Sequence, residues 1–257
     1  MRNKTFFRGM VAIAAIVFAA TTTGCQKETT APVTEAVSAT GDSASIVSSL
    51  ARFRSLLGDS LNTAPGKTGG RREINWDAVP PSLNDNNLFP GNFFAQTDSL
   101  LPNGRKRGAT FTSSVAEDFR ISSLGFEDVK AGFSAQFKRF SPKLIFGLMK
   151  TNTVDITFKV PGTSTDATVK GFGVIFLGVD AENKTGMEFF DLEGNSLGKF
   201  YAKAYGSGYS FLGVKFKDAN TVAKVRITAG EEGIGEISSY KDKVAMDDFL
   251  YDEPVAQ

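Results

Sequence analysis

Alternation of apolar and polar residues with a period of two dominates the second half of the chain. Residues 153–160 alternate, with Val154, Ile156 and Phe158 on the apolar side. This is the pattern of a strand that buries one face and exposes the other to water. Residues 212–217 and 223–228 show the same alternation. Residues 187–190 and 197–205 flank a Gly-Asn turn, as the two strands of a hairpin do.

One predicted strand is apolar on both faces. Residues 167–180 become continuously apolar toward their end, as expected for a strand in the middle of a sheet. The last predicted strand covers residues 244–251. Glycine and asparagine turns separate the strands, and no strand–helix–strand rhythm occurs. The pattern therefore predicts an all-β domain over 73–254, built as an antiparallel β-sandwich.

A helical period occurs before the strand region. It predicts a short amphipathic helix or docking arm, which with the loop after it spans 46–72. Residues 25–45 are rich in Thr, Ala and Ser and contain no aromatic residue, so we expect a flexible tether there. The apolar residues at helical spacing are Ile46, Leu50, Phe53, Leu57 and Leu61.

The beginning of the chain has the features of an export signal. Basic residues precede an unbroken apolar run over 10–20, which is too short for a membrane-spanning helix and suits a signal peptide. The Thr-Gly-Cys boundary at Cys25 resembles a bacterial lipoprotein signal. We therefore expect a signal peptide over 1–24, a lipid anchor on Cys25, and a place in the cell envelope, at the outer membrane and exposed on the surface. An ordinary secretory signal is the alternative.

Composition removes several classes of function. The chain of 257 residues has no histidine and one cysteine, which excludes Ser-His-Asp and Cys-His catalysis and histidine-ligated zinc. The 29 Lys and Arg residues balance 28 Asp and Glu residues, giving a net charge of +1. This balance argues against a nucleic-acid partner.

Eight short motifs together resemble a known family. They lie at 71–80, 88–94, 107–111, 172–176, 188–191, 211–214, 225–228 and 246–251. As a set they are similar to a family of secreted or lipid-anchored bacterial jelly-roll domains of unknown activity, which are themselves similar to lectin-like and carbohydrate-binding modules. The resemblance covers residues 71–254 and implies a jelly-roll-type sandwich.

Asp247 and Asp248 are adjacent in the last predicted strand. Strict alternation predicts that their side chains point to opposite faces, so one carboxylate faces apolar neighbours and needs a partner. A structural calcium ion is one candidate partner, because calcium binds carboxylate and carbonyl oxygens. If the first and last strands of the sandwich lie side by side, Asp77 would join Asp247 and Asp248 as a ligand. The alternatives are backbone N–H groups or an arginine, namely Arg71, Arg72 or Arg226.

Aromatic residues supply a second kind of candidate. Tyr201, Tyr205 and Tyr209 follow one another closely and could form a platform for a sugar face. Trp76 is the only tryptophan, and we expect it to belong to the core of the sandwich. The densest basic stretch, residues 103–108, is flanked by glycine and suits an exposed turn or, as an alternative, a site for an acidic glycan.

The sequence thus favours a non-catalytic surface module that binds carbohydrate or another extracellular polymer. A carboxylate-dependent glycoside hydrolase is the alternative, because such enzymes need only two acidic side chains. A purely structural envelope component is the third possibility. Acidic residues that could supply a hydrolase pair are Asp180, Glu182, Glu188, Asp191 and Glu193.

Overall fold

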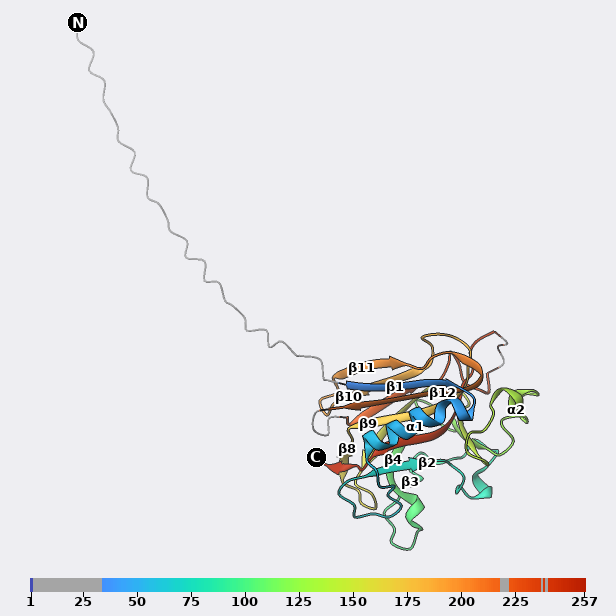
Figure 1. The fold of residues 1–257 in the computed structure, drawn as a ribbon, viewed down its shortest axis with the longest axis horizontal. Coiled ribbons are helices and arrows are strands. Elements are labelled where there is room, and N and C mark those ends of the chain that lie inside the picture. The colour runs from blue at the N-terminus through green and yellow to red at the C-terminus, as the bar shows by residue number, and fades with distance from the viewer. Residues whose placement is uncertain (2–33, 218–221, 237, 239) are drawn as a thin grey trace. The chain divides into compact units, whose positions relative to one another are not determined.

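The computed structural model describes residues 1, 34–217, 222–236, 238 and 240–257. Two antiparallel sheets form a β-sandwich, which confirms the all-β prediction (Figure 1). The first sheet has seven strands, in the order β1 (Thr34–Gly41), β12 (Tyr205–Phe216), β9 (Gly171–Val179), β14 (Ala245–Asp252), β6 (Ile145–Leu148) and β5 (Phe119–Ser122), with β2 (Arg71–Ile74) also paired to β14.

The second sheet has eight strands. Its order is β11 (Ser196–Tyr201), β10 (Gly186–Phe190), β13 (Lys224–Thr228), β7 (Thr153–Lys159), β4 (Lys106–Thr112) and β3 (Phe94–Ala95), with β8 (Asp166–Thr168) paired to β7 and β15 (Val255–Ala256) paired to β8. Two short 3₁₀-helices, η1 (Pro81–Leu83) and η2 (Asn103–Arg105), lie in the loops around β3.

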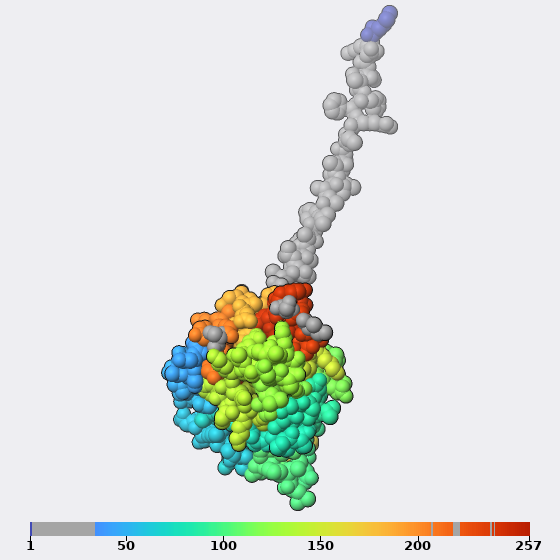
Figure 2. Space-filling model, turned by 90° about the vertical axis from the view of Figure 1, so that its right-hand side faces the viewer, coloured from blue at the N-terminus to red at the C-terminus, as the bar shows by residue number. Residues whose placement is uncertain are grey.

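The two sheets differ in what covers their outer faces. Helix α1 (Ser43–Leu57) and the segment around the short helix α2 (Phe133–Gln136) pack on the outer face of the seven-stranded sheet, which we call the helix-covered sheet. The segment around α2 lies at the centre of the face seen in Figure 2. The eight-stranded sheet, called the open sheet, exposes alternate residues, as β7 shows by burying every second side chain.

Helix α1 confirms the predicted amphipathic helix. Its buried residues are Ile46, Leu50, Phe53 and Leu57. The carboxylate of Asp42 caps its first turn by accepting a hydrogen bond from the Ser45 N–H at 2.9 Å, because the first N–H groups of a helix have no partner within it. The predicted stripe ends one turn early, since Leu61 lies beyond the helix and is exposed.

Glycines let α1 approach the sheet closely. Gly173 of β9 pairs with Gly213 of β12, and the Phe53 ring lies directly over both. A Cβ atom at either glycine would come within 2.6 Å of that ring. The missing side chains therefore make room for the ring, which is wholly buried.

Strand β1 corrects the predicted tether. Residues 34–41, expected to be part of a flexible segment over 25–45, pair over their whole length with β12, from Thr34 opposite Phe216 to Gly41 opposite Tyr209. Their order comes from main-chain hydrogen bonds to a sheet edge, which Thr, Ala and Ser form as well as apolar residues do. The sandwich domain thus includes this strand and α1.

Candidate functional site

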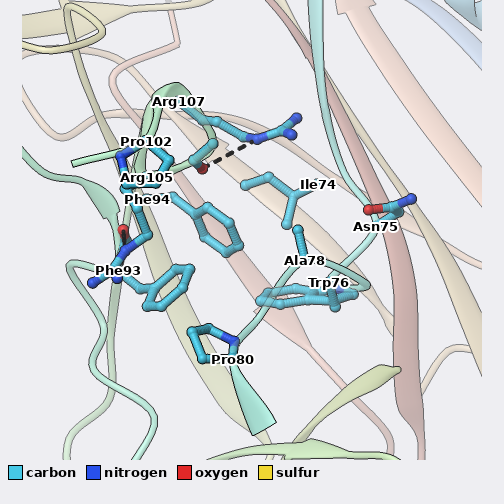
Figure 3. A pocket seen from close by; sticks show the side chains of 11 residues that line it. Ile74, Asn75, Trp76, Ala78, Pro80, Phe93, Phe94, Pro102, Arg105 and Arg107 are labelled. Atoms are coloured by element: carbon cyan, nitrogen blue, oxygen red, sulfur yellow. Dashed lines mark hydrogen bonds between the residues drawn. The ribbon is translucent and has the colours of Figure 1, made fainter. Parts of the chain in front are cut away.

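A slot of about 150 Å³ opens at one edge of the core between the sheets. It lies between the turn that follows β2 and the segment that runs from β3 through η2 into β4 (Figure 3). Its lining combines apolar side chains with two guanidinium groups. The lining residues are Ile74, Asn75, Trp76, Ala78, Pro80, Phe93, Phe94, Pro102, Gly104, Arg105 and Arg107.

Trp76 forms the inner wall of the slot. It is 1% exposed, which confirms that it belongs to the core. Its backbone has a φ of 66°, an unusual conformation for a bulky residue. Two contacts hold it there: the indole N–H donates to the carbonyl oxygen of Asp247 at 2.7 Å, and the ring stacks on Phe146 with centroids 4.6 Å apart.

Two arginines form the rim. The Arg105 guanidinium lies 3.7 Å from the centroid of the Phe93 ring, and its Nε donates to the Phe93 carbonyl at 3.2 Å. Arg107 donates from Nη1 to the Glu73 carbonyl. Its Nε donates to the Gly104 carbonyl at 3.4 Å, the bond drawn as a dashed line in Figure 3. These bonds fix both side chains while leaving further N–H donors on each.

The rim is a site of uncompensated positive charge. Burial lowers the pKa of the Arg107 guanidinium, because desolvation disfavours a charged group, yet an arginine stays protonated. Within the described residues neither Arg105 nor Arg107 forms an ion pair with a carboxylate. The nearby Glu73 is instead held by Arg54 and Arg71. An anion at the rim of the slot would therefore find a guanidinium group that no carboxylate neutralises.

Strand β14 contains a bulge beside Trp76. Met246 pairs with Phe176, but Phe249 pairs with Val174, so β14 has one more residue than β9 over this stretch. The extra residue reverses the alternation that the sequence predicts. Val244, Met246, Phe249 and Tyr251 face the core between the sheets, whereas Ala245 and Leu250 face the helix side.

The bulge also places both carboxylates against one segment, so the prediction of opposite faces is wrong. Asp247 accepts hydrogen bonds from the N–H groups of Phe140 and Ser141 at 2.7 and 3.2 Å. Asp248 accepts from the Ser141 hydroxyl at 2.6 Å. Of the alternatives that the sequence left open, backbone N–H groups are the ones that hold Asp247.

The two carboxyl groups share a buried site that disfavours charge. Burial, and then the neighbouring charge of Asp248, raise the pKa of Asp247 well above its ordinary value. Burial raises the pKa of Asp248 as well. Two carboxylates in contact cannot both ionise without a large penalty. The pair therefore retains a proton under neutral conditions and acts as a structural clamp on the segment before β6.

The three aspartates are not assembled as the predicted calcium site. Asp77 accepts hydrogen bonds from the N–H groups of Lys143 and Leu144 at 3.1 and 3.0 Å, and so secures the same segment from another side. Among the described residues, no group of three or more acidic, cysteine or histidine residues is placed to hold a metal ion.

The arginines named as alternative partners have other carboxylates. Arg71 pairs with Glu73, Arg72 with Glu253, and Arg226 with Asp155. None of these pairs involves Asp247 or Asp248.

The three tyrosines do not come together as one platform. Tyr201 is exposed at the end of β11 in the open sheet, with the Lys199 ammonium 5.3 Å from its ring centroid. Tyr205 is exposed where β12 begins. Tyr209 is half-buried on the helix side, where it packs edge-on against Phe140 and donates a hydrogen bond to the Arg139 carbonyl at 2.8 Å.

The acidic residues proposed for a hydrolase serve turns and strand ends. Asp191 accepts from the Asn195 N–H at 2.7 Å within its own hairpin. Glu188 accepts from the Ser196 hydroxyl at 2.7 Å, and Glu182 from the Ala204 N–H at 3.1 Å. The slot itself is lined by no carboxyl, hydroxyl or thiol group.

Comparison with known proteins leaves the family open. No protein-family model matches the chain, and no curated protein sequence matches it. Among the described residues, no helix has the length and apolar character needed to cross a membrane. The expected signal peptide over 1–24 and the expected lipid site Cys25 lie outside the described residues.

Sequence reasoning did not find the slot as a site. The entry motif at 71–80 and the basic stretch at 103–108 supply two of its parts, but no local pattern indicates that they face each other. Phe93 and Phe94 complete the wall. They lie in the motif at 88–94, which the sequence distinguishes only through the family resemblance.

Proposed function

We propose that this protein is a lipid-anchored, non-catalytic binding module of the cell envelope, and that it binds an extracellular polymer through the slot. The observation that carries the proposal is an apolar slot whose lining includes two arginines, Arg105 and Arg107, that form no ion pair with a carboxylate within the described residues. Concave, mostly apolar pockets with a few fixed polar groups are the usual form of ligand sites.

The same lining supports binding over catalysis. Glycoside hydrolysis needs a pair of carboxyl groups flanking the reacting bond, whereas the slot presents only arginine and asparagine side chains beside its apolar wall. Arginine and asparagine donate hydrogen bonds but supply no nucleophile or general acid near neutral pH. The hydrolase alternative therefore has no support from the slot.

The proposal also includes the type of fold and the location of the protein in the cell. The motif resemblance to secreted bacterial jelly-roll domains agrees with an antiparallel sandwich, and it supports a jelly-roll-type module related to carbohydrate-binding domains. We place the protein at the outer membrane, exposed on the surface and tethered through Cys25. The supporting feature is the short apolar run that ends near this only cysteine.

An array of glycans and other extracellular polymers tests the binding function. The full chain, purified in detergent, is compared with the double variant Arg105→Gln and Arg107→Gln. We expect the native chain to retain one class of anionic polymer and the variant to lose that binding. Equal binding by both proteins, or release of polymer fragments over time, would contradict the proposal.

Membrane fractionation tests the anchor. Replacing Cys25 by Ala removes the thiol to which lipid would be attached, so the exported protein should move from the membrane fraction to the soluble fraction. If the variant is exported normally and stays with the membrane, lipidation at this residue is excluded.

A further inference from the structure

We infer that the slot recognises a carboxylate carried by a single benzene-sized apolar group, and that it does not recognise a run of sugar rings. The inference rests on the proposed binding function and names the chemical unit that enters the site. Three properties of the slot lead to it: its size, the polarity of its wall and the placement of its charge.

The size of the slot admits one ring or one branched aliphatic group. Its volume is about 150 Å³, close to that of engineered apolar cavities that bind benzene. Trp76 and Phe94 close its inner side, and they are 1% and 5% exposed. A polymer cannot pass through such a slot, so the bound unit is an end group or a side group.

The wall provides few partners for hydroxyl groups. Aromatic, proline and aliphatic side chains make up most of the lining. A sugar ring carries hydroxyls around its whole edge, and burying them without hydrogen bonds is costly. Trp76 also turns no open face outward, because its ring stacks on Phe146 and is almost fully buried. An apolar group fits this wall better than a sugar does.

The charge on the rim selects an anion next to that apolar group. Arg105 and Arg107 both line the slot, and both keep N–H donors beyond the bonds that hold them in place. A guanidinium group binds a carboxylate through two parallel hydrogen bonds. A carboxylate a few bonds from the buried ring pairs with one of these guanidinium groups, that of Arg107, while the ring fills the slot.

Two sources share this chemistry. A free aryl or branched-chain acid presents it directly, and the last residue of a polypeptide presents it when its side chain is apolar. A pair of probes distinguishes them: 3-phenylpropanoate has only the ring and the carboxylate, whereas N-acetylphenylalanine adds the amide of a chain end. Tighter binding of the second probe indicates a polypeptide end, and equal binding indicates the free acid; either result agrees with the inference.

Trp76 is a built-in reporter, because it is the only tryptophan in the chain and lines the slot. Each probe is titrated into the full chain while the tryptophan fluorescence is recorded. For ligands of about a dozen heavy atoms we expect dissociation constants on the order of 0.1–1 mM. The amide of each acid and galacturonate should bind at least about tenfold more weakly, since each lacks either the charge or the apolar group.

Gly104 offers a variant that blocks the slot with little risk to the fold. It lines the slot, and a Cβ atom built on it would meet no atom within 4 Å. Gly104→Leu should therefore fill the mouth and abolish probe binding. Gly69→Leu is the matched control, because a Cβ at Gly69 also meets nothing within 4 Å and that residue lies in another loop. Arg107→Gln should weaken the acids and leave the amides unchanged.

The outcomes separate this inference from the proposed function. If galacturonate or the amides bind as tightly as the acids, or if the acids do not bind at all, the inference is overturned. The binding function would still stand if an anionic polymer is retained by the native chain and lost on Gly104→Leu. If no polymer depends on Gly104 or on the two arginines, the binding function itself fails.

Discussion

The helix-covered sheet and the open sheet are built from the same kind of strand but differ in whether their polar side chains can reach water. In β9 and β14 every residue is buried, because α1 and the α2 segment cover the outer face. In β7 of the open sheet the burial alternates from one residue to the next. Charged residues of the open sheet can therefore use water, whereas those of the helix-covered sheet need partners inside the protein.

Two bidentate ion pairs show the contrast directly. Arg72 of β2 binds Glu253 with both groups almost fully buried, at 0% and 2% exposure. Arg226 of β13 binds Asp155 with the same two-bond geometry, but their side chains are 46% and 24% exposed. Equal geometry in different surroundings predicts unequal effects on stability, since burial makes an unpaired charge costly.

The largest effect is expected at the contact between α1 and the helix-covered sheet. Phe53→Ala removes a wholly buried ring that sits over Gly173 and Gly213, and should lower the free energy of unfolding by about 3–5 kcal/mol. Phe190→Ala, on the outer face of the open sheet, is the matched control and should cost about 1 kcal/mol. Urea denaturation of both variants checks this. Equal losses would mean that α1 does not contribute to the folded core.

The buried ion pair should come next. Arg72→Met leaves Glu253 without its main partner and is expected to cost about 3–5 kcal/mol, whereas Arg226→Met should cost at most about 1 kcal/mol. Adding salt should reduce the second effect and leave the first nearly unchanged, because salt screens exposed charges best. Thermal unfolding at low and high salt measures both. A large loss for Arg226→Met would show that the open sheet depends on its surface charges.

The carboxyl pair in β14 predicts a pH effect with a definite sign. The pKa of Asp247 is raised in the folded protein, so the folded state binds this proton more tightly than the unfolded state does. Stability is then lost as the pH rises above about 4, by at most about 1.4 kcal/mol per pH unit from this group. Asp247→Asn mimics the protonated acid, and should raise the melting temperature at pH ~8 with a gain that vanishes toward pH ~4.

Asp166→Asn, at an exposed aspartate of β8 in the open sheet, is the control for that measurement. Its side chain is 70% exposed and its ion pair with Lys159 lies at the surface, where such pairs contribute little to stability, so the substitution should leave the pH profile of unfolding nearly unchanged. If Asp247→Asn also leaves the profile unchanged, the pair in β14 is not the buried clamp that its contacts indicate.

The same contrast explains which parts of the fold the sequence predicts. Strands β7 and β13 of the open sheet are predicted from alternation, because water on one face keeps a period of two, whereas the shorter β3, β8 and β15 and the strand β4 are not predicted. The burial stripe of α1 was found for the equivalent reason, at residues Ile46, Leu50, Phe53 and Leu57. Strand β1 was missed because main-chain pairing with β12 orders it, and few of its side chains are buried.

The bulge and the slot lie beyond local patterns. One extra residue in β14 changes which side chains face the core, and no residue type between Met246 and Phe249 indicates that a bulge occurs there. The wall of the slot depends on the bond from Trp76 to the Asp247 carbonyl, between residues 171 positions apart. The basic stretch at 103–108 was visible, but its role depends on the aromatic residues that the fold brings beside it.

The smallest effects on stability are expected for the tyrosines, where the same Tyr→Phe substitution can be made on either side of the sandwich. Tyr209→Phe removes a hydroxyl that donates to the Arg139 carbonyl from a half-buried position, and should cost about 1 kcal/mol. Tyr201→Phe removes an exposed hydroxyl of the open sheet, and we expect no measurable loss, because water replaces the lost contact. Neither substitution should alter binding of a carboxylate probe, since neither tyrosine lines the slot. Loss of probe binding in either variant would return the tyrosines to the binding surface and place the ligand away from Arg105 and Arg107.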